Sequence, residues 1–359
     1  MQKRTAIVLL NLGGPDKPES IRPFLINFFM DKNIIKAPYP VRYLVSRLIA
    51  NKRSKNEAGS AYAKLGGKSP LLENTMQQAG ALQGELGSDY RVFVCMRYWH
   101  PMSDEVTKLV KDYDPDQVLL VPLYPQYSTT TSRSSFEDWK KSAAKNNLKA
   151  PTKLLCCYPD DEGFIAASVQ NIKTEYTKLK NQSGQAPRLL FSAHGLPEKI
   201  VKAGDPYQYQ CEESARMIAE KLEIPDLDWS ICYQSRVGPL KWIGPSTEEA
   251  LELAAKSKVP VLIYPHAFVS EHVETLVEIE DEYRHLAKEL GIPAFARVST
   301  VGTSQPFIKG LAERIKRLSH STKSQDSRFC PMHFSKCCHN ETDRLGFAQD
   351  RSLKIVNFP

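Results

Sequence analysis

Short apolar runs alternate with helical patterns along most of the chain. There are eight such runs, the first being TAIVLLN from residue 5, and each ends at a polar, Gly or Pro turn. They lack strict apolar/polar alternation, which is typical of strands buried on both faces of a parallel sheet. Amphipathic helical patterns lie between most of them, at 73–86, 102–113, 161–180, 209–223, 246–257 and 270–289. This order predicts an α/β protein with doubly wound parallel sheets.

The predicted strands fall into two sets of four, separated near residue 183 by the polar stretch KNQSGQAP. We therefore expect two similar Rossmann-like domains, each a four-stranded parallel sheet flanked by helices, that face one cleft. The predicted bounds are 1–183 for the N-terminal domain, 184–318 for the C-terminal domain and 319–359 for a cysteine-bearing extension. A chain of 359 residues with 42% apolar content can bury cores of this size.

The segment 270–289 carries an unusual row of acidic residues. At about 100° per residue, a helix places one group of polar side chains on a single arc: Glu271, Glu274, Glu278, Asp281, Glu282 and His285. No Lys or Arg lies on that arc to form i,i+4 pairs, so we expect the carboxylates to be unpaired. An ordinary acidic surface helix is one interpretation, and a path for a cation or for protons is the other.

The carboxyl ends of parallel strands favour the second interpretation. Ligands of such sheets bind beyond these ends, where the acidic row begins and where SAHGLP places His194 just after another strand. A lone histidine is more often structural, but neutral imidazole beside carboxylates can accept a proton or bind Fe²⁺. The loop NLGGP at 11–15 lacks both phosphate-loop patterns, so we do not expect a nucleotide.

Charge is concentrated in one part of the chain, although the formal net charge is only +7. Residues 32–56 contain seven basic side chains and no acidic one, and they follow the apolar stretch PFLINFFM at 23–30. This combination predicts binding to an anionic membrane surface or to an apolar ligand with carboxylates. A core-facing helix followed by a solvated basic helix is the alternative. We do not expect nucleic acid as a partner.

The lengths of the apolar runs indicate the cellular compartment of the protein. The first run is too short for a secretory signal, and no run approaches the roughly 18–20 apolar residues of a membrane span. We therefore expect a cytoplasmic protein that can attach peripherally to the inner face of the cell membrane. Eight cysteines in such a chain argue against a disulfide framework.

Seven ordered motifs resemble the ferrochelatase family over about residues 5–318: NLGGP, LGGKSPL, MRYWHP, YPQYS, SAHGLP, YQSRVGPLKWIGP and FVSEHVETLVEIEDEY. The resemblance implies the chelatase fold and a lyase that inserts Fe²⁺ into protoporphyrin IX. The product is protohaem, two protons are released, and the step is the last of haem biosynthesis. A non-catalytic tetrapyrrole carrier or haem chaperone, and a chelatase for another metal or for coproporphyrin, are the alternatives. A homodimer is also left open.

The resemblance also assigns roles to individual residues. It implies that His194 and Glu274 are the catalytic and metal-binding pair, and that Glu271, Glu278 and Glu282 line a path for protons or metal. Residues implied in porphyrin binding are Leu12, Lys64, Arg97, Tyr98, Trp242 and Phe268. Glu271 stands where animal relatives carry Asp, and Lys64 where they carry Arg, so a bidentate grip on a carboxylate is not expected at Lys64.

The tail sequence FCPMHFSKCCHNE resembles an extension that carries a [2Fe–2S] cluster in some family members. The implied ligands are Cys156 from the body and Cys330, Cys337 and Cys338 from the tail. Relatives place one residue between the last two cysteines, whereas these two are adjacent here. The choice between Cys156 and Cys157, and between Cys337 and Cys338, is therefore open. A zinc site using His333 or His339, or simply reduced thiols, are the alternatives.

Overall fold

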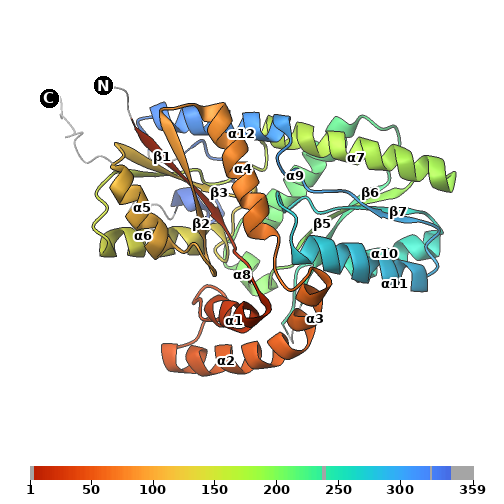
Figure 1. Ribbon diagram of the computed structural model, residues 1–359. Helices are drawn as coiled ribbons and strands as arrows, with labels where there is room; N and C mark the ends of the chain where they lie inside the picture. Colours follow the sequence, from red (N-terminus) through yellow and green to blue (C-terminus); the bar gives the residue numbers. More distant parts are fainter. Residues whose placement is uncertain (1–3, 237–239, 324–325, 341–359) are drawn as a thin grey trace.

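The computed structural model describes residues 4–236, 240–323 and 326–340. Two four-stranded parallel sheets form its frame (Figure 1). The first has the order β2-β1-β3-β4, with β1 (Thr5–Asn11), β2 (Tyr90–Met96), β3 (Gln117–Pro122) and β4 (Thr152–Leu154). The second has the order β6-β5-β7-β8, with β5 (Arg188–His194), β6 (Trp229–Gln234), β7 (Val261–Tyr264) and β8 (Phe295–Arg297). The predicted fold class is confirmed, because each of the eight apolar runs contains one strand.

The central strands explain why those runs lack alternation. β1 pairs with β2 and β3 on its two sides, and β5 pairs in the same way with β6 and β7. Every residue of β1, β3 and β7 is buried, since helices cover both faces of each sheet. The edge strands β4 and β8 are only three residues long and are partly exposed.

The helices that flank the sheets follow the predicted pattern with some additions. The predicted helices correspond to α4 (Leu71–Leu86), α5 (Ser103–Tyr113), α7 (Glu162–Ser183), α9 (Tyr207–Leu222) and α10 (Thr247–Ser257). Local signals set their ends: Ser246 caps α10 in a capping box with Glu249, and Gly184, with φ of +72°, ends α7. The helices α6 (Ser132–Lys145), α8 (Glu198–Lys202) and α12 (Gln305–His320) were not predicted.

Two long helices connect the halves of the molecule. α7 precedes the second sheet in sequence and packs against β7, β8 and α9. α12 follows that sheet and packs against α4 and β3 of the first half, and the two helices also pack against each other (Figure 1). Phe164 of α7 and Phe307 of α12 form an aromatic cluster with Tyr158 at this junction. The predicted bounds at 183/184 and 318/319 stay predictions.

A layer of three helices lies below the sheets in Figure 1. It consists of α1 (Ile21–Phe29), preceded by the 3₁₀ turn η1 (Pro18–Ser20), α2 (Tyr39–Lys55) and α3 (Glu57–Lys64). Of the two interpretations of residues 23–30, the structure agrees with the core-facing helix, because Phe24, Leu25 and Phe29 are buried against neighbouring helices. The exposed apolar side chains belong to α2 instead, and they are Tyr39, Val41, Tyr43, Leu44 and Leu48.

The acidic segment differs from the predicted α-helix. It forms a π-helix, η2 (Glu274–Tyr283), which continues as α11 (Arg284–Glu289). Its amphipathic character is as expected, since Val277, Ile279 and Tyr283 are buried and Glu282 is exposed. Over ten residues, the spacing of apolar positions does not distinguish the α-helical repeat from the wider turn that i→i+5 bonding produces, and π-helical turns frequently occur at functional sites. Within the described ranges, no helix is long and apolar enough to span a bilayer.

Candidate active site

His194 and Glu274 meet where two adjacent strands of the second sheet end. His194 is the last residue of β5, and Glu274 begins η2, which follows the neighbouring strand β7. The Nε2 atom of His194 lies 3.8 Å from the Oε1 atom of Glu274. The Nδ1 atom of His194 lies 2.7 Å from the carbonyl oxygen of Gly195, which can only accept, so Nδ1 carries a proton and Nε2 faces the carboxylate. The His194 side chain is 41% exposed.

A second histidine, His272, faces the same carboxylate. Its Nε2 atom lies 3.6 Å from the Oε2 atom of Glu274, and its ring stacks at 4.6 Å on the ring of Phe268. Burial raises the pKa of Glu274, but His194 and His272 together outweigh it and hold that pKa at about 2. Glu274 is therefore ionised at physiological pH. Sequence reasoning missed His272, although it lies only two residues before Glu274.

Glu278 continues the acidic row in a different electrostatic state. Its carboxylate accepts hydrogen bonds from the backbone and hydroxyl of Ser235, from the Gln234 amide at 3.1 Å and from the Tyr283 hydroxyl at 3.1 Å. Burial, followed by repulsion from Glu274, raises the pKa of Glu278 despite these bonds. Glu282, the last acid of the row, is exposed. The row thus begins at the ionised carboxylate of Glu274, continues with Glu278, which protonates more readily, and ends at Glu282, which is in contact with solvent.

Other carboxylates of the row have cationic partners, contrary to the expectation. Glu271 accepts two bonds from Arg297, at 2.9 and 3.1 Å, and one from the backbone of Thr300 at 2.9 Å. Asp281 pairs with Lys64 of α3. The helical repeat reveals only partners within the same helix, whereas these cations come from β8 and α3. Expecting an unpaired row was therefore wrong for Asp281 and Glu271.

Two of the predicted porphyrin-binding residues lie in a buried polar network. Arg97 forms ion pairs with Asp31 at 3.1 Å and with Asp138 at 3.6 Å, and it also donates to Ser134. The Tyr98 hydroxyl donates to Asp31 at 2.7 Å. Although burial raises the pKa of Asp31, Arg97 and hydrogen bonds outweigh it and lower that pKa. These contacts fix Asp31, which follows α1, to α6 and leave Lys64 as the exposed cation of the predicted set.

The predicted apolar wall residues come from three separate segments, and two of them lie beside the two histidines that face Glu274. Trp242 packs on Gly195, where a Cβ atom would lie 3.2 Å from the indole ring, so the small residue permits this contact. Phe268 stacks on His272, and Leu12 packs against the cluster formed by α1, α2 and α3. Val273, next to Glu274, packs against the same cluster. The helical layer is thus in contact with the start of η2.

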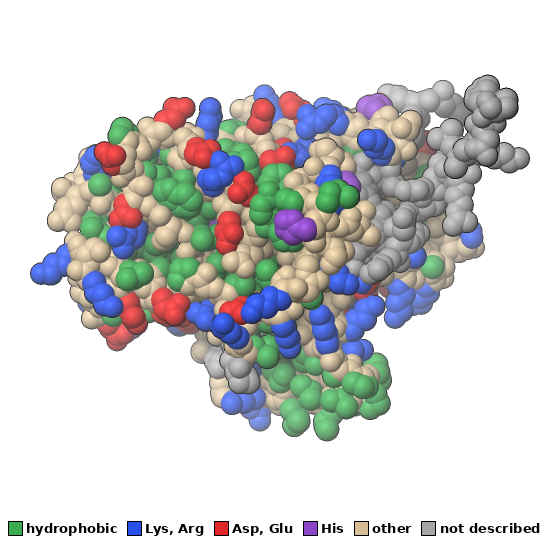
Figure 2. All heavy atoms as spheres, turned by 180° about the vertical axis from the view of Figure 1, so that it is seen from behind, with side chains coloured by type: hydrophobic (Ala, Val, Ile, Leu, Met, Phe, Trp, Pro, Cys, Tyr) green, Lys and Arg blue, Asp and Glu red, His purple; other side chains and the backbone are tan. Residues whose placement is uncertain are grey.

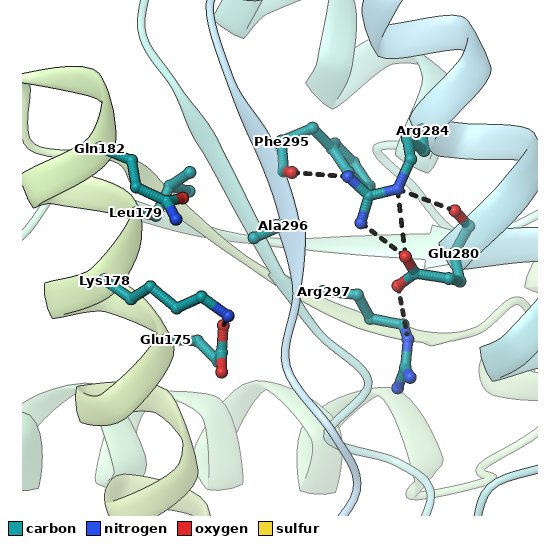
Figure 3. A pocket seen from close by; sticks show the side chains of 9 residues that line it. All are labelled: Glu175, Lys178, Leu179, Gln182, Glu280, Arg284, Phe295, Ala296 and Arg297. Atoms are coloured by element: carbon teal, nitrogen blue, oxygen red, sulfur yellow. Dashed lines mark hydrogen bonds and ion pairs between the residues drawn. The ribbon is translucent and has the colours of Figure 1, made fainter.

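A polar pocket of about 410 Å³ lies between α7, η2, α11 and β8 (Figure 3). Its charged side chains are paired, since Glu280 accepts bonds from Arg284 and Arg297, while Lys178 pairs with Glu175. A second pocket of about 350 Å³ is lined by residues of α8 and α9 and by Ile243 and Gly244. Neither pocket contains His194 or Glu274, so the predicted chemistry lies outside both.

The tail returns to the body near the end of β4, where five buried thiols converge: Cys156, Cys157, Cys330, Cys337 and Cys338. His333 is exposed and stacks on Phe334, whereas the Nε2 atom of His339 is buried without a hydrogen-bond partner. The thiols touch one another, and in the described part of the chain no three His, Cys, Asp or Glu side chains are arranged to hold a metal ion.

Comparison with known proteins agrees with this architecture. A family model described as Ferrochelatase matches residues 4–318. A ferrochelatase of Wolbachia sp. subsp. Drosophila simulans is 50% identical over 314 residues, covering 86% of this chain and 98% of that protein. One from Caulobacter vibrioides is 46% identical over 346 residues, covering 94% and 98%. The structure of SirB from Bacillus subtilis with Fe³⁺ shares the fold, with a TM-score of 0.52 and 11% identity over 88% of this chain and 96% of that one.

Proposed function

This chain belongs to the ferrochelatase family, and on that premise we propose that His194 and Glu274 form its catalytic pair. The enzyme inserts Fe²⁺ into protoporphyrin IX to form protohaem. The observation that supports the assignment is the contact between Nε2 of His194 and the carboxylate of Glu274 at the ends of adjacent strands. General acid–base chemistry requires such groups within reach of the substrate.

The proposed chemistry follows from the states of the three groups. Metallation removes two pyrrole protons, and Nε2 of His194, which faces the Glu274 carboxylate, can accept a proton when it carries none. Glu274 stays ionised, so it stabilises the resulting imidazolium and can also bind the substrate Fe²⁺. Glu278, whose pKa is raised, would take the proton next, and exposed Glu282 would release it to solvent. Glu271 would form the inner end of the acidic row, where the ion pair with Arg297 neutralises the charge of Glu271.

We propose that Leu12, Trp242 and Phe268 form the apolar wall against which the macrocycle lies. Porphyrin is flat and apolar with two propionates, so it needs such walls and a few cationic or hydroxyl groups. Lys64 is the exposed cation that can reach a propionate. Arg97 and Tyr98 would act through the network with Asp31, holding the helical layer in place beside the substrate.

The activity is tested by incubating the purified protein anaerobically with Fe²⁺ and protoporphyrin IX. We expect porphyrin fluorescence to fall as the haem absorption appears. Porphyrin binding without metallation would instead indicate a carrier or haem chaperone. Faster turnover with Co²⁺ or with coproporphyrin would indicate a different chelatase.

We further propose that the protein attaches peripherally to the inner face of the cell membrane through α2. Figure 2 shows hydrophobic side chains gathered on the protruding part of the molecule, next to many Lys and Arg side chains. Five large apolar side chains of α2 are exposed, and the helix contains Arg42, Arg47, Lys52, Arg53 and Lys55 but no acid. Each basic residue near an anionic surface contributes about 1 kcal/mol, so attachment should be reversible and weakened by salt.

For the tail we propose a [2Fe–2S] cluster held by cysteine thiolates. Two segments more than a hundred residues apart bring five buried thiols together, and the buried Nε2 of His339 beside them lacks a hydrogen-bond partner. When bound, such a cluster supplies one-electron redox chemistry; these thiols would fix the tail to the body. Anaerobically purified protein should contain about two irons and two sulfides per chain. One zinc without sulfide would favour a site with His333 or His339.

A further inference from the structure

The hydroxyl of Tyr283 lies between two carboxylates, one buried and one exposed. Its oxygen is 3.1 Å from Oε1 of Glu278 and 3.4 Å from Oε1 of Glu248. Glu278 belongs to the acidic row, whereas Glu248 is an exposed residue in the first turn of α10. Tyr283 itself is buried. One buried hydroxyl therefore connects the inner part of the acidic row to a carboxylate at the surface.

The π-helical turns of η2 explain why Tyr283 meets Glu278. The two residues are five positions apart, and the wider turn of i→i+5 bonding brings such residues onto neighbouring positions of the helix. In an α-helix, at about 100° per residue, they would be turned about 140° away from each other. The helix α10 brings Glu248 to the same hydroxyl, because it packs against α11, the continuation of η2 (Figure 1).

The hydroxyl has one proton but two carboxylate neighbours. It can donate to only one of them at a time, so the other contact is a hydrogen bond only when that carboxyl is protonated and donates to the tyrosine oxygen. Glu278 is suited to carry this proton, because burial and repulsion from Glu274 raise its pKa. Glu248 lies at the N-terminus of a helix, where the dipole favours negative charge. The three groups therefore form a chain of donors and acceptors that leads from Glu278 to the surface.

We infer that protons from metallation leave the acidic row at Glu278 and pass through the hydroxyl of Tyr283 to Glu248. The O–H bond of protonated Glu278 breaks and its proton moves to the Tyr283 oxygen. At the same time the Tyr283 O–H bond breaks, and that proton moves to the Glu248 carboxylate. Tyr283 stays neutral throughout, because burial and the two carboxylates raise its pKa. Glu248 then gives the proton to water, and the hydroxyl turns back towards Glu278.

The inference rests on the proposed proton path as far as Glu278 and changes only the outlet of that path. In the described part of the chain, the hydrogen-bond partners of Glu278 are Gln234, Ser235 and Tyr283. Of these three, Tyr283 is the one that contacts a second acidic side chain. Exposure alone suggested Glu282 as the outlet, whereas Glu248 is both exposed and connected.

The test measures turnover of the full-length enzyme with Fe²⁺ and protoporphyrin IX. Tyr283→Phe and Glu248→Gln should each lower kcat by about tenfold or more and leave the KM for porphyrin unchanged, because proton transfer is slowed and binding is not. Glu252→Gln, at an exposed acid one turn further along α10, is the control for Glu248. Tyr90→Phe, which removes a buried hydroxyl contact with Ser319, is the control for Tyr283. Both controls should keep the wild-type kcat.

Two further measurements distinguish a proton relay from a structural contact. The ratio of kcat in H₂O to kcat in D₂O should rise in both relay variants, since proton transfer then limits turnover. A non-coordinating buffer at high concentration should restore the kcat of Glu248→Gln, because the buffer accepts the proton at the surface. It should not restore that of Tyr283→Phe, in which the chain is broken inside the protein. A lower kcat with an unchanged isotope effect and no rescue would overturn the inference.

The variant Glu278→Gln separates failure of the relay from failure of the proposed function. Wild-type turnover of Glu278→Gln would contradict the proposed proton path and the relay with it. Slow turnover of Glu278→Gln, with normal kcat in Tyr283→Phe and Glu248→Gln, would overturn the relay alone. If Glu282→Gln were then also slow, the outlet would be Glu282, and the proposed path would stand without the relay.

Discussion

Glu274 remains charged in a partly buried position because two histidines flank it. Burial alone would raise its pKa, yet His194 and His272 hold that pKa at about 2. Since this pKa lies below the ordinary glutamate value of 4.5, the ionised carboxylate favours the folded state above pH 4.5. That contribution is lost as pH falls towards 2. For Glu278 the sign is opposite, because its pKa is raised, and its contribution weakens as pH rises above 4.5.

The first prediction concerns the catalytic pair. Glu274→Gln and His194→Ala should each lower kcat by about 10²- to 10⁴-fold, the usual range for acid–base groups, while porphyrin still binds. His194→Ala should also raise the pKa of Glu274, because it removes the largest stabilising charge, so the acidic limb of the kcat/KM profile should move to higher pH. His285→Ala, an exposed histidine of α11, is the control and should leave kcat and the profile unchanged. Near-normal turnover in either active-site variant would remove that residue from the mechanism.

A second prediction concerns the ion pair of Glu271 with Arg297, whose side chains are 23% and 10% exposed. Arg297→Met should lower the free energy of unfolding by about 3–5 kcal/mol, because it leaves a largely buried carboxylate without its partner. The double variant Glu271→Gln/Arg297→Met should recover most of that loss in denaturant titrations. Arg284→Met, whose ion pair is more exposed, should cost less than about 1 kcal/mol. Equal losses in the single and double variants would show that the charge is not the cause.

The sequence predicted the positions of some active-site residues but not of their partners. His194 and Glu274 were predicted to be neighbours because both follow parallel strands, whose carboxyl ends share one edge. Arg297 also stands at the end of a strand, β8, but the sequence does not indicate which carboxylate it pairs with, because it meets Glu271 only through folding. The same holds for Glu248, whose contact with Tyr283 joins residues 35 positions apart.

At the scale of elements, buried strands were the most predictable part of the fold. Their residues are apolar on both faces, so each run stands out from its polar surroundings. The helix α2 was harder to interpret, because its apolar residues face solvent while those of α1 are buried. The sequence shows which residues are apolar but not which of them neighbouring elements cover.

The third prediction belongs to α2. The double variant Leu44→Glu/Leu48→Glu should greatly reduce flotation with vesicles of anionic lipid at low salt, since it removes two exposed apolar side chains and adds two negative charges. Leu253→Glu, at a similarly exposed leucine of α10, is the matched control and should float like the wild type. Raised salt should release the wild type. Equal flotation of all three proteins would exclude α2 as the contact.

At the scale of the whole molecule, the two halves are joined beside the acidic row. Gln78 of α4 is buried and donates to the carbonyl oxygens of Val269 and Gly302, both at 2.9 Å, and it accepts from the Ser270 hydroxyl. Asn74 of the same helix donates to the backbone of Glu271. The first half therefore fixes the loop that leads into Glu274. Helical periodicity could not predict this, since glutamine is usually a surface residue.

The fourth prediction tests this junction. Gln78→Leu should lower the free energy of unfolding by about 1–3 kcal/mol, because it leaves buried carbonyl groups unpaired, and it should also lower kcat because the loop before Glu274 is no longer held. Gln83→Leu is the matched control on α4. Its amide contacts only the first half, at Gly87, Tyr90 and Val92, so it should lose stability without losing kcat in the surviving folded enzyme. Similar kcat losses in both variants would contradict the proposed coupling.

The equivalent strand orders of the two sheets place β1 and β5 at matching positions of the two halves. β1 and β5 occupy the same place, both have seven residues, and they end at Asn11 and His194. Equivalent positions of the two halves nevertheless carry different side chains. Asn11 donates to Thr75 within the first half, while the corresponding position in the second half carries the histidine that faces Glu274.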